Sequence, residues 1–369
     1  MTTQTIKMFD YRDQYLDLEN EVLGAVQRVL RSGELILGSE VEAFEAGFSE
    51  FLGHGTHSLG VANGTDALVV CLMALGVGPG DEVITVANTA VPTVSAIRMV
   101  RATPVFVDVD PNTALMDLNL VPGLITSKTR AIIPVHLFGN AVNMPALLDI
   151  ARARGIPVIE DCAQAHGTLI NGRAAGTFGQ AAAFSFYPTK NLGAYGDGGL
   201  CATSDVALAK EMRRIRKYGF DDLYYAEREG INSRLDEVQA AILNIKLRHL
   251  PAQLQKRRAL ADVYKAGLPS AVKHMAAPSG VDHAYHLFVV RTKERDALRT
   301  ALASHKIQTG IHYPFPIHRM RGYGFLGYQD HSLPVTEALA NEIVSLPLYP
   351  ELPIESAQRV LDTLHEILD

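Results

Sequence analysis

The chain has 369 residues, of which 47% are hydrophobic and 20% are charged. This balance excludes a disordered chain and leaves enough apolar residues for a sizeable core. The net charge of −6 argues against nucleic acid as a partner. The sequence shows neither a signal segment nor a run of about 18 apolar residues, so we expect a cytoplasmic protein without membrane association.

Short β-branched segments alternate with helical ones between residues 58 and 204. This alternation predicts an α/β fold, with a mainly parallel mixed sheet and helices on both faces. The expected strands read SLGV, EVITV, PVFVDV, AIIPVHL, PVIED, AAFSF and GLCAT. Helices are expected over residues 65–75 and 144–154, because a glycine follows each of these segments.

The second half of the chain has a different pattern. Residues 232–265 predict one long or broken helix, with Pro251 as the expected break, followed by a strand in AYHLFVVR and helices over 294–304 and 355–368. We therefore expect a large domain over residues 1–250 and a smaller C-terminal α+β domain over 251–369. The N-terminal segment can pack on the small domain.

The three cysteines, Cys71, Cys162 and Cys201, are expected to be buried free thiols. They are odd in number and lack CxxC spacing, and no HExxH or HxxxH motif accompanies them. We therefore expect no metal site. His286 and His318 are expected to satisfy local hydrogen bonds rather than to bind a substrate.

Two segments place reactive groups where strands end. PVIED ends in Glu160 and Asp161, at the edge where open α/β sheets bind ligands, although solvated acids would explain this pattern equally well. The strand that reaches Ser185 leads into a glycine-rich loop that carries Lys190. Lys190 could form a Schiff base with pyridoxal 5'-phosphate (PLP) while Asp161 pairs with the pyridinium nitrogen.

A third segment, VANGTDAL, predicts a strand, a turn and the start of a helix. The backbone amides of Gly64 and Thr65 at a helix start could bind a phosphate. Ordinary turn and capping chemistry is the alternative for an Asn-Gly pair in this position.

Five ordered motifs together resemble one family. VANGTDAL, EDCAQAHG, SFYPTKNLGAYGDGG, NSRLDEVQAAIL and GIHYPFPIH are similar to those of the DegT/DnrJ/EryC1/StrS sugar aminotransferases, over residues 33–350. The resemblance implies the fold of type I PLP-dependent transferases. It also implies that Lys190 is the Schiff-base lysine and moves a proton between cofactor and substrate.

The same resemblance implies the rest of the cofactor site. It places Asp161 on the pyridine nitrogen, Gln164 near the ring oxygen, and Ser185 with the amides of Gly64 and Thr65 on the phosphate. Ala163 is expected to pack on one face of the ring. Ala90 stands where many relatives carry an aromatic residue that stacks on the ring, so another group has to supply that contact.

The resemblance further implies a homodimer in which Asn232 of one subunit binds the cofactor phosphate of the other. Residues expected to face the nucleotide-linked sugar are Tyr187, Tyr218, His312 and Tyr313. Retention of lysine at position 190 favours transamination, because a related dehydratase branch carries histidine there.

We therefore expect transfer of an amino group from L-glutamate to a nucleotide-linked keto-sugar. The motifs NSRLDEVQAAIL and FYPTKNLGAYGDGG are more similar to those of relatives that aminate a 3-keto sugar, so we expect a dTDP-linked 3-keto-6-deoxyhexose. A 4-keto-sugar aminotransferase is the alternative within the family. A catalytically silent regulatory protein and a PLP enzyme with another substrate, such as a cysteine desulfurase or an amino-acid aminotransferase, are the alternatives outside it.

Overall fold

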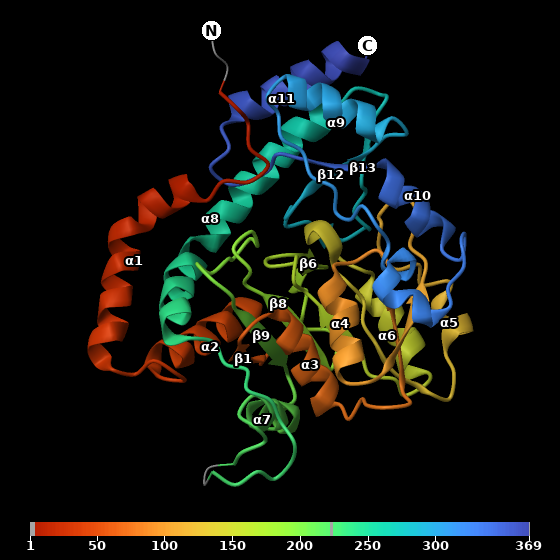
Figure 1. The fold of residues 1–369 in the computed structure, drawn as a ribbon. Helices are drawn as coiled ribbons and strands as arrows, with labels where there is room; N and C mark the ends of the chain where they lie inside the picture. Colours follow the sequence, from red (N-terminus) through yellow and green to blue (C-terminus); the bar gives the residue numbers. More distant parts are fainter. Residues whose placement is uncertain (1–3, 222–223, 369) are drawn as a thin grey trace.

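The computed structural model describes residues 4–221 and 224–368, and its centre is a seven-stranded mixed sheet (Figure 1). The strands are β1 (His57–Val61), β2 (Glu82–Val86), β3 (Thr103–Val107), β4 (Thr129–Ile132), β5 (Ile159–Asp161), β8 (Ala181–Ser185) and β9 (Gly199–Thr203). Two hydrogen-bonded sets, β1-β9-β8-β5 and β3-β2-β4, are joined by parallel bridges from Ile132 to Val158 and from Val135 to Asp161. β9 pairs antiparallel with both β1 and β8, whereas the pairs β2-β3, β2-β4 and β5-β8 are parallel.

Alternate residues of these strands enter two separate cores, one on each face of the sheet. Val83, Ile159 and Ala183 belong to one core, and Ile84, Val158 and Ala182 belong to the other. Helices that contribute to the cores include α2 (Ser39–Leu52), α3 (Gly64–Ala74), α4 (Val91–Met99), α5 (Val121–Leu124), α6 (Met144–Arg152) and α7 (Val206–Ile215). All seven expected strands and the helices on both faces are thus confirmed.

The cysteines lie inside these cores, as expected. Cys71 is on α3, Cys201 is on β9, and Cys162 directly follows β5; all three are fully buried free thiols. Burial raises the pKa of Cys162 and of Cys201 well above the usual range, so both thiols stay protonated near neutral pH.

The long helix is continuous, so the expected break at Pro251 was wrong and the alternative of one long helix is confirmed. α8 (Glu237–Gly267) continues through Pro251, which lies on its exposed side. Leu250 and Leu254 are buried on either side of the proline, so packing holds the helix together across the missing N–H. A long first helix, α1 (Arg12–Ser32), packs along α8 (Figure 1).

The C-terminal part of α8 enters another core. This core includes α9 (Arg295–Ser304), β12 (Phe288–Arg291), β13 (Ile343–Leu346) and α11 (Ile354–Leu368), and Ile6 near the N-terminus joins it. β10 (Lys273–His274) pairs with β12. Because α8 crosses residue 250 without interruption, the domain boundary at that position stays a prediction.

The remaining elements are short. They are β6 (Leu169–Ile170), β7 (Arg173–Ala174), β11 (Val281–Asp282), α10 (Pro334–Glu342), η1 (Leu137–Gly139), η2 (Ile317–Arg319) and η3 (Arg321–Leu326). In the part of the chain that the structure describes, no helix is both long and apolar enough to cross a membrane.

Candidate active site

Lys190 and Asp161 line the same cavity, which has a volume of about 540 Å³. The topology explains this meeting. β5 and β8 are adjacent parallel strands, so the residues at their carboxyl ends, Asp161 and Ser185, lie at the same edge of the sheet. The loop after β8 then brings Lys190 over that edge.

The carboxylate of Asp161 is held by two donors. The Thr93 hydroxyl donates to Oδ2 at 2.8 Å and the Ala163 amide donates to Oδ1 at 3.1 Å. Burial raises the pKa of Asp161, against the lowering effect of these two bonds and of the Lys190 ammonium. The acid is therefore oriented but keeps capacity for another charged or hydrogen-bonding partner.

Burial has the opposite effect on the amine. It lowers the pKa of Lys190 to about 8, against a raising contribution from Asp161. A lysine with this pKa has a substantial neutral fraction near physiological pH, which a free lysine lacks. Lys190 can thus act as a nucleophile and as a proton acceptor.

The start of α3 forms another wall of the cavity. The Asn63 side chain caps the helix by accepting a hydrogen bond from the Asp66 amide at 2.9 Å. This cap leaves the first helical amides, of Gly64 and Thr65, available for an anion. A Cβ at Gly64 would lie 2.6 Å from the Ser185 Cβ, so glycine is required for the helix start to approach β8.

Gln164 is buried and is not among the described residues that line the cavity. Its Oε1 accepts from the Phe138 amide at 2.7 Å, and its Nε2 donates to the Tyr313 hydroxyl at 2.9 Å. Burial raises the pKa of Tyr313. Gln164 therefore couples the segment after β5 to the C-terminal part of the chain.

His312 is mostly buried, and its Nδ1 lies 2.8 Å from the Ser345 hydroxyl. Burial, with a contribution from the Lys190 charge, lowers the pKa of His312 to about 4, so the imidazole is neutral at physiological pH. Among the described residues, neither His312 nor Tyr313 lines the cavity of Lys190, whereas Tyr187 lines it and is 54% exposed.

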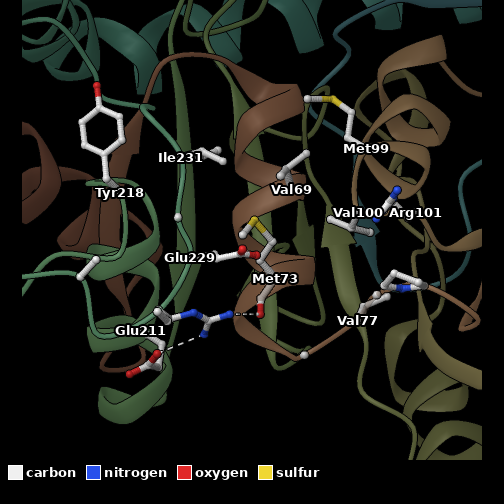
Figure 2. A pocket seen from close by; sticks show the side chains of 16 residues that line it. Val69, Met73, Val77, Met99, Val100, Arg101, Glu211, Tyr218, Glu229 and Ile231 are labelled. Carbon is white, nitrogen blue, oxygen red and sulfur yellow. Dashed lines mark hydrogen bonds and ion pairs between the residues drawn. The ribbon is translucent and has the colours of Figure 1, made fainter.

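Two predicted site residues lie elsewhere in the same chain. Asn232 is exposed and forms an antiparallel bridge with Lys217. Tyr218 borders a different cavity of about 1370 Å³, which residues of α3, the end of α4 and the segment 226–231 also line. Figure 2 shows that its ring lies apart from Val69 and Met73, with the hydroxyl pointing away from them.

Glu160, the other acid at the end of β5, is fully engaged within the protein. Its carboxylate accepts from the amides of Gly176, Phe178 and Gly179 at 2.7–2.8 Å and lies 2.9 Å from His136 Nε2. With Cys162, these two side chains form a cluster that could hold a metal. The Val142 amide donates to His136 Nδ1 at 3.1 Å, so hydrogen bonds already account for both side chains.

The two remaining histidines of interest behave as expected. His286 Nδ1 lies 3.3 Å from Asn191 Oδ1, and His318 Nε2 lies 3.0 Å from a carboxylate oxygen of Glu337. A local hydrogen bond is confirmed for one ring nitrogen of each, whereas His318 Nδ1 is buried without a partner among the described residues.

Sequence reasoning missed Thr93. This residue is buried on α4, donates its hydroxyl proton to Asp161 and therefore accepts a hydrogen bond from the Thr89 hydroxyl at 2.9 Å. Ala90, at the N-terminal end of the same helix, lines the cavity as a small side chain. A hydroxyl at the first turn of a helix that follows a sheet edge is the signal that could have identified Thr93.

Comparison with known proteins gives a consistent assignment. Residues 16–365 match the model of the DegT/DnrJ/EryC1/StrS aminotransferase family. The chain is 47% identical to a dTDP-3-amino-3,4,6-trideoxy-alpha-D-glucose transaminase of Micromonospora megalomicea, covering 99% of each protein. It is 43% identical, over 98% of each, to a protein of Geobacillus stearothermophilus named a pleiotropic regulatory protein.

A crystal structure of Streptomyces venezuelae DesV in complex with a ketimine intermediate has a TM-score of 0.96 to this chain, at 42% identity, and covers 99% of this chain and 98% of the other. Other matching structures contain PLP or its amino form. The prediction of a type I PLP fold is confirmed, and a silent regulatory protein is not favoured. The chain belongs to the DegT/DnrJ/EryC1/StrS aminotransferase family, as a PLP-dependent enzyme that aminates nucleotide-linked keto-sugars.

Proposed function

We propose that this enzyme transfers the amino group of L-glutamate to a dTDP-linked 3-keto-6-deoxyhexose, with Lys190 as the residue that binds PLP covalently. The observation that carries the proposal is the meeting of a buried acid, Asp161, and a partly buried amine, Lys190, in one cavity at the sheet edge. The name of the Micromonospora relative supports the choice of a 3-amino sugar.

The residues of the cavity fit the cofactor. The free amides of Gly64 and Thr65, with the Ser185 hydroxyl close by, suit a phosphate, and the Gly64 approach to Ser185 leaves no room for a side chain at that point. Asp161 suits a protonated ring nitrogen, because its carboxylate is oriented and buried. Ala163 lines the same space and suits one face of a ring.

When bound, PLP supplies an aldehyde carbon that takes up the amino group and a ring that withdraws electrons from the reacting carbon. Asp161 would keep that ring nitrogen protonated. Lys190, once released from the cofactor, would accept the proton from the reacting carbon as a neutral amine and return it from the resulting ammonium. Gln164 would act through its bonds to Phe138 and Tyr313, near the ring oxygen.

The proposal includes a homodimer with shared active sites. Asn232 and Tyr218 are both outside the Lys190 cavity of their own chain. Asn232 is exposed, and Tyr224 and Tyr225 in the same segment are 86% and 66% exposed. A second subunit would cover these side chains and place Asn232 at its phosphate site. We expect this dimer in the cytoplasm.

Sugar recognition is proposed for four residues. Tyr187 is exposed at the cavity and can contact a substrate directly. The Lys190 charge acts on His312, Tyr313 accepts a hydrogen bond from Gln164, and Tyr218 would come from the neighbouring subunit. Each can offer a hydrogen bond to a sugar hydroxyl, and His312 would do so as a neutral imidazole.

The test is a substrate panel. The purified enzyme with PLP and L-glutamate is incubated with dTDP-linked 3-keto and 4-keto sugars and with a UDP-linked 3-keto sugar, and the products are analysed by NMR. We expect a 3-amino product from the dTDP-3-keto sugar. Amination only at carbon 4 would replace the proposed substrate with the alternative, and no amination of any sugar would contradict the proposed function.

A further inference from the structure

A second lysine lies beneath the loop that carries Lys190. Lys246 is on α8, is only 3% exposed, and donates a hydrogen bond to the carbonyl oxygen of Gly193. Its ammonium also lies 4.7 Å from the centre of the Tyr195 ring. Burying an ammonium is unfavourable unless it is bound, so this side chain needs both of these contacts.

The loop is tightly folded, so the backbone near Gly193 contacts the backbone just before Lys190. The Lys190 amide donates to the Tyr187 carbonyl at 2.8 Å, and the Ala194 amide donates to the Phe186 carbonyl at 2.8 Å. A Cβ at Gly193 would lie 2.5 Å from the Pro188 carbonyl oxygen. The backbone that Lys246 holds is thus in contact with the residue two positions before Lys190.

A second side chain of α8 holds the same loop. Gln239, two turns before Lys246, accepts from the Tyr195 amide at 3.0 Å and donates to the Tyr195 carbonyl at 3.4 Å. Residues seven apart share one face of a helix, so both contacts come from one side of α8. The ring of Tyr195 packs against Tyr15 of α1, which fills the space next to Lys246.

The buried position of Lys246 disfavours its charged form. Burial lowers its pKa to about 8, against a raising contribution from Glu351. An apolar side chain of similar length would fill this space without that cost. The contact with Gly193 is therefore explained better by a requirement on the loop than by stability alone.

We propose that Lys246 and Gln239 are positioning residues, which fix the Pro188–Gly196 loop from α8 and thereby aim the Lys190 amine into the cavity. Neither touches the cofactor site, so both act through the loop backbone. This inference rests on the proposed role of Lys190 as the residue that binds PLP.

The test uses Lys246→Met and Gln239→Leu in the full-length enzyme. Asn244→Ala is the matched control, because Asn244 is on the same helix but donates to the backbone and side chain of Glu40 on α2. Hydrogen exchange of the amides of residues 190–196 is measured in the cofactor-free protein, with competitive labelling of Lys190 by a small amine-reactive reagent. kcat and KM are measured with PLP, glutamate and the keto-sugar.

We expect about tenfold faster exchange in the loop and altered labelling of Lys190 in both variants, because the loop loses its anchors. kcat should fall roughly 10- to 100-fold while KM for the keto-sugar changes less than about twofold, since the amine and not the sugar site is displaced. The control should match the wild type in every measurement.

Wild-type exchange, labelling and kcat in folded variants would overturn the inference. If Lys246→Met does not fold, Gln239→Leu decides in the same way, because its removal leaves no unpaired buried charge. Failure of the wild-type enzyme to bind PLP through Lys190 would instead reject the proposed function, and the inference with it.

Discussion

Two neighbouring acids at the end of β5 have very different surroundings. Glu160 accepts hydrogen bonds from three backbone amides and lies beside His136, in the interior of the protein. Asp161, the next residue, accepts hydrogen bonds from one amide and one hydroxyl, and it lines a cavity that Lys190 also lines. The comparison separates an acid that holds the fold together from an acid whose environment suits a ligand.

The largest expected effect concerns the amine on the Asp161 side. Lys190→Met should lower turnover by at least about 10³-fold, because it removes both the covalent attachment and the proton carrier. The assay is formation of the amino sugar at saturating PLP. Turnover close to that of the wild type would remove Lys190 from the mechanism.

The same substitution should stabilise the cofactor-free protein at pH 7. A fall of the Lys190 pKa from 10.5 to about 8 means that folding penalises the charged amine by up to about 3 kcal/mol, and by less where water in the cavity screens it. This penalty is complete below pH 8 and disappears as pH rises from about 8 toward 10.5. Urea unfolding of both proteins at pH 7 and pH 10 measures it, and an equal difference at both values would contradict it.

The two acids themselves give the next effects. Asp161→Asn should lower kcat about 10²-fold or more while leaving stability nearly unchanged, because the amide cannot keep a ring nitrogen protonated. Glu160→Gln should lower the free energy of unfolding by roughly 3 kcal/mol, because a buried network loses its charge-assisted bonds. Steady-state kinetics and urea unfolding are measured on both variants. A large loss of stability in Asp161→Asn, or a large loss of kcat without loss of stability in Glu160→Gln, would contradict these assignments.

The walls of the cavity give a smaller effect. Gly64→Ala should weaken PLP binding roughly tenfold, because its methyl group would meet Ser185 at 2.6 Å and push the start of α3 away from β8. Titration of the cofactor-free protein with PLP measures the affinity. Gly78→Ala is a suitable control, because a Cβ at Gly78 meets nothing within 4 Å.

The smallest effect is expected at Thr93. Thr93→Val removes the hydroxyl that donates to Asp161 but keeps the shape, and should lower kcat by about fivefold to tenfold. Thr89→Val is the matched control, because its hydroxyl reaches Thr93 and not Asp161. Equal losses in the two variants would argue against a specific effect on Asp161.

Local patterns were sufficient for much of this molecule. The seven strands, the helices over residues 64–74 and 144–152, and the meeting of Asp161, Ser185 and Lys190 at one edge follow from strand ends and glycine-rich turns. Pro251 misled the prediction, because tertiary packing of Leu250 and Leu254 overrides its local preference. α1 was not predicted at all.

Other features of the site depend on contacts between distant parts of the chain. The bond from Gln164 to Tyr313 joins residues 149 positions apart, and Thr93 reaches Asp161 from 68 positions away. Neither pairing leaves a pattern in a single sequence. The roles of Asn232 and Tyr218 depend on a second subunit, so they stay predictions.

The most direct test is reductive trapping. The wild-type enzyme is loaded with PLP, treated with borohydride and digested, and the labelled peptide is identified by mass spectrometry. We expect one label, on Lys190 in the peptide that contains FYPTKNLGAYG. A label on Lys246 or on any other amine, or no label at all, would contradict it.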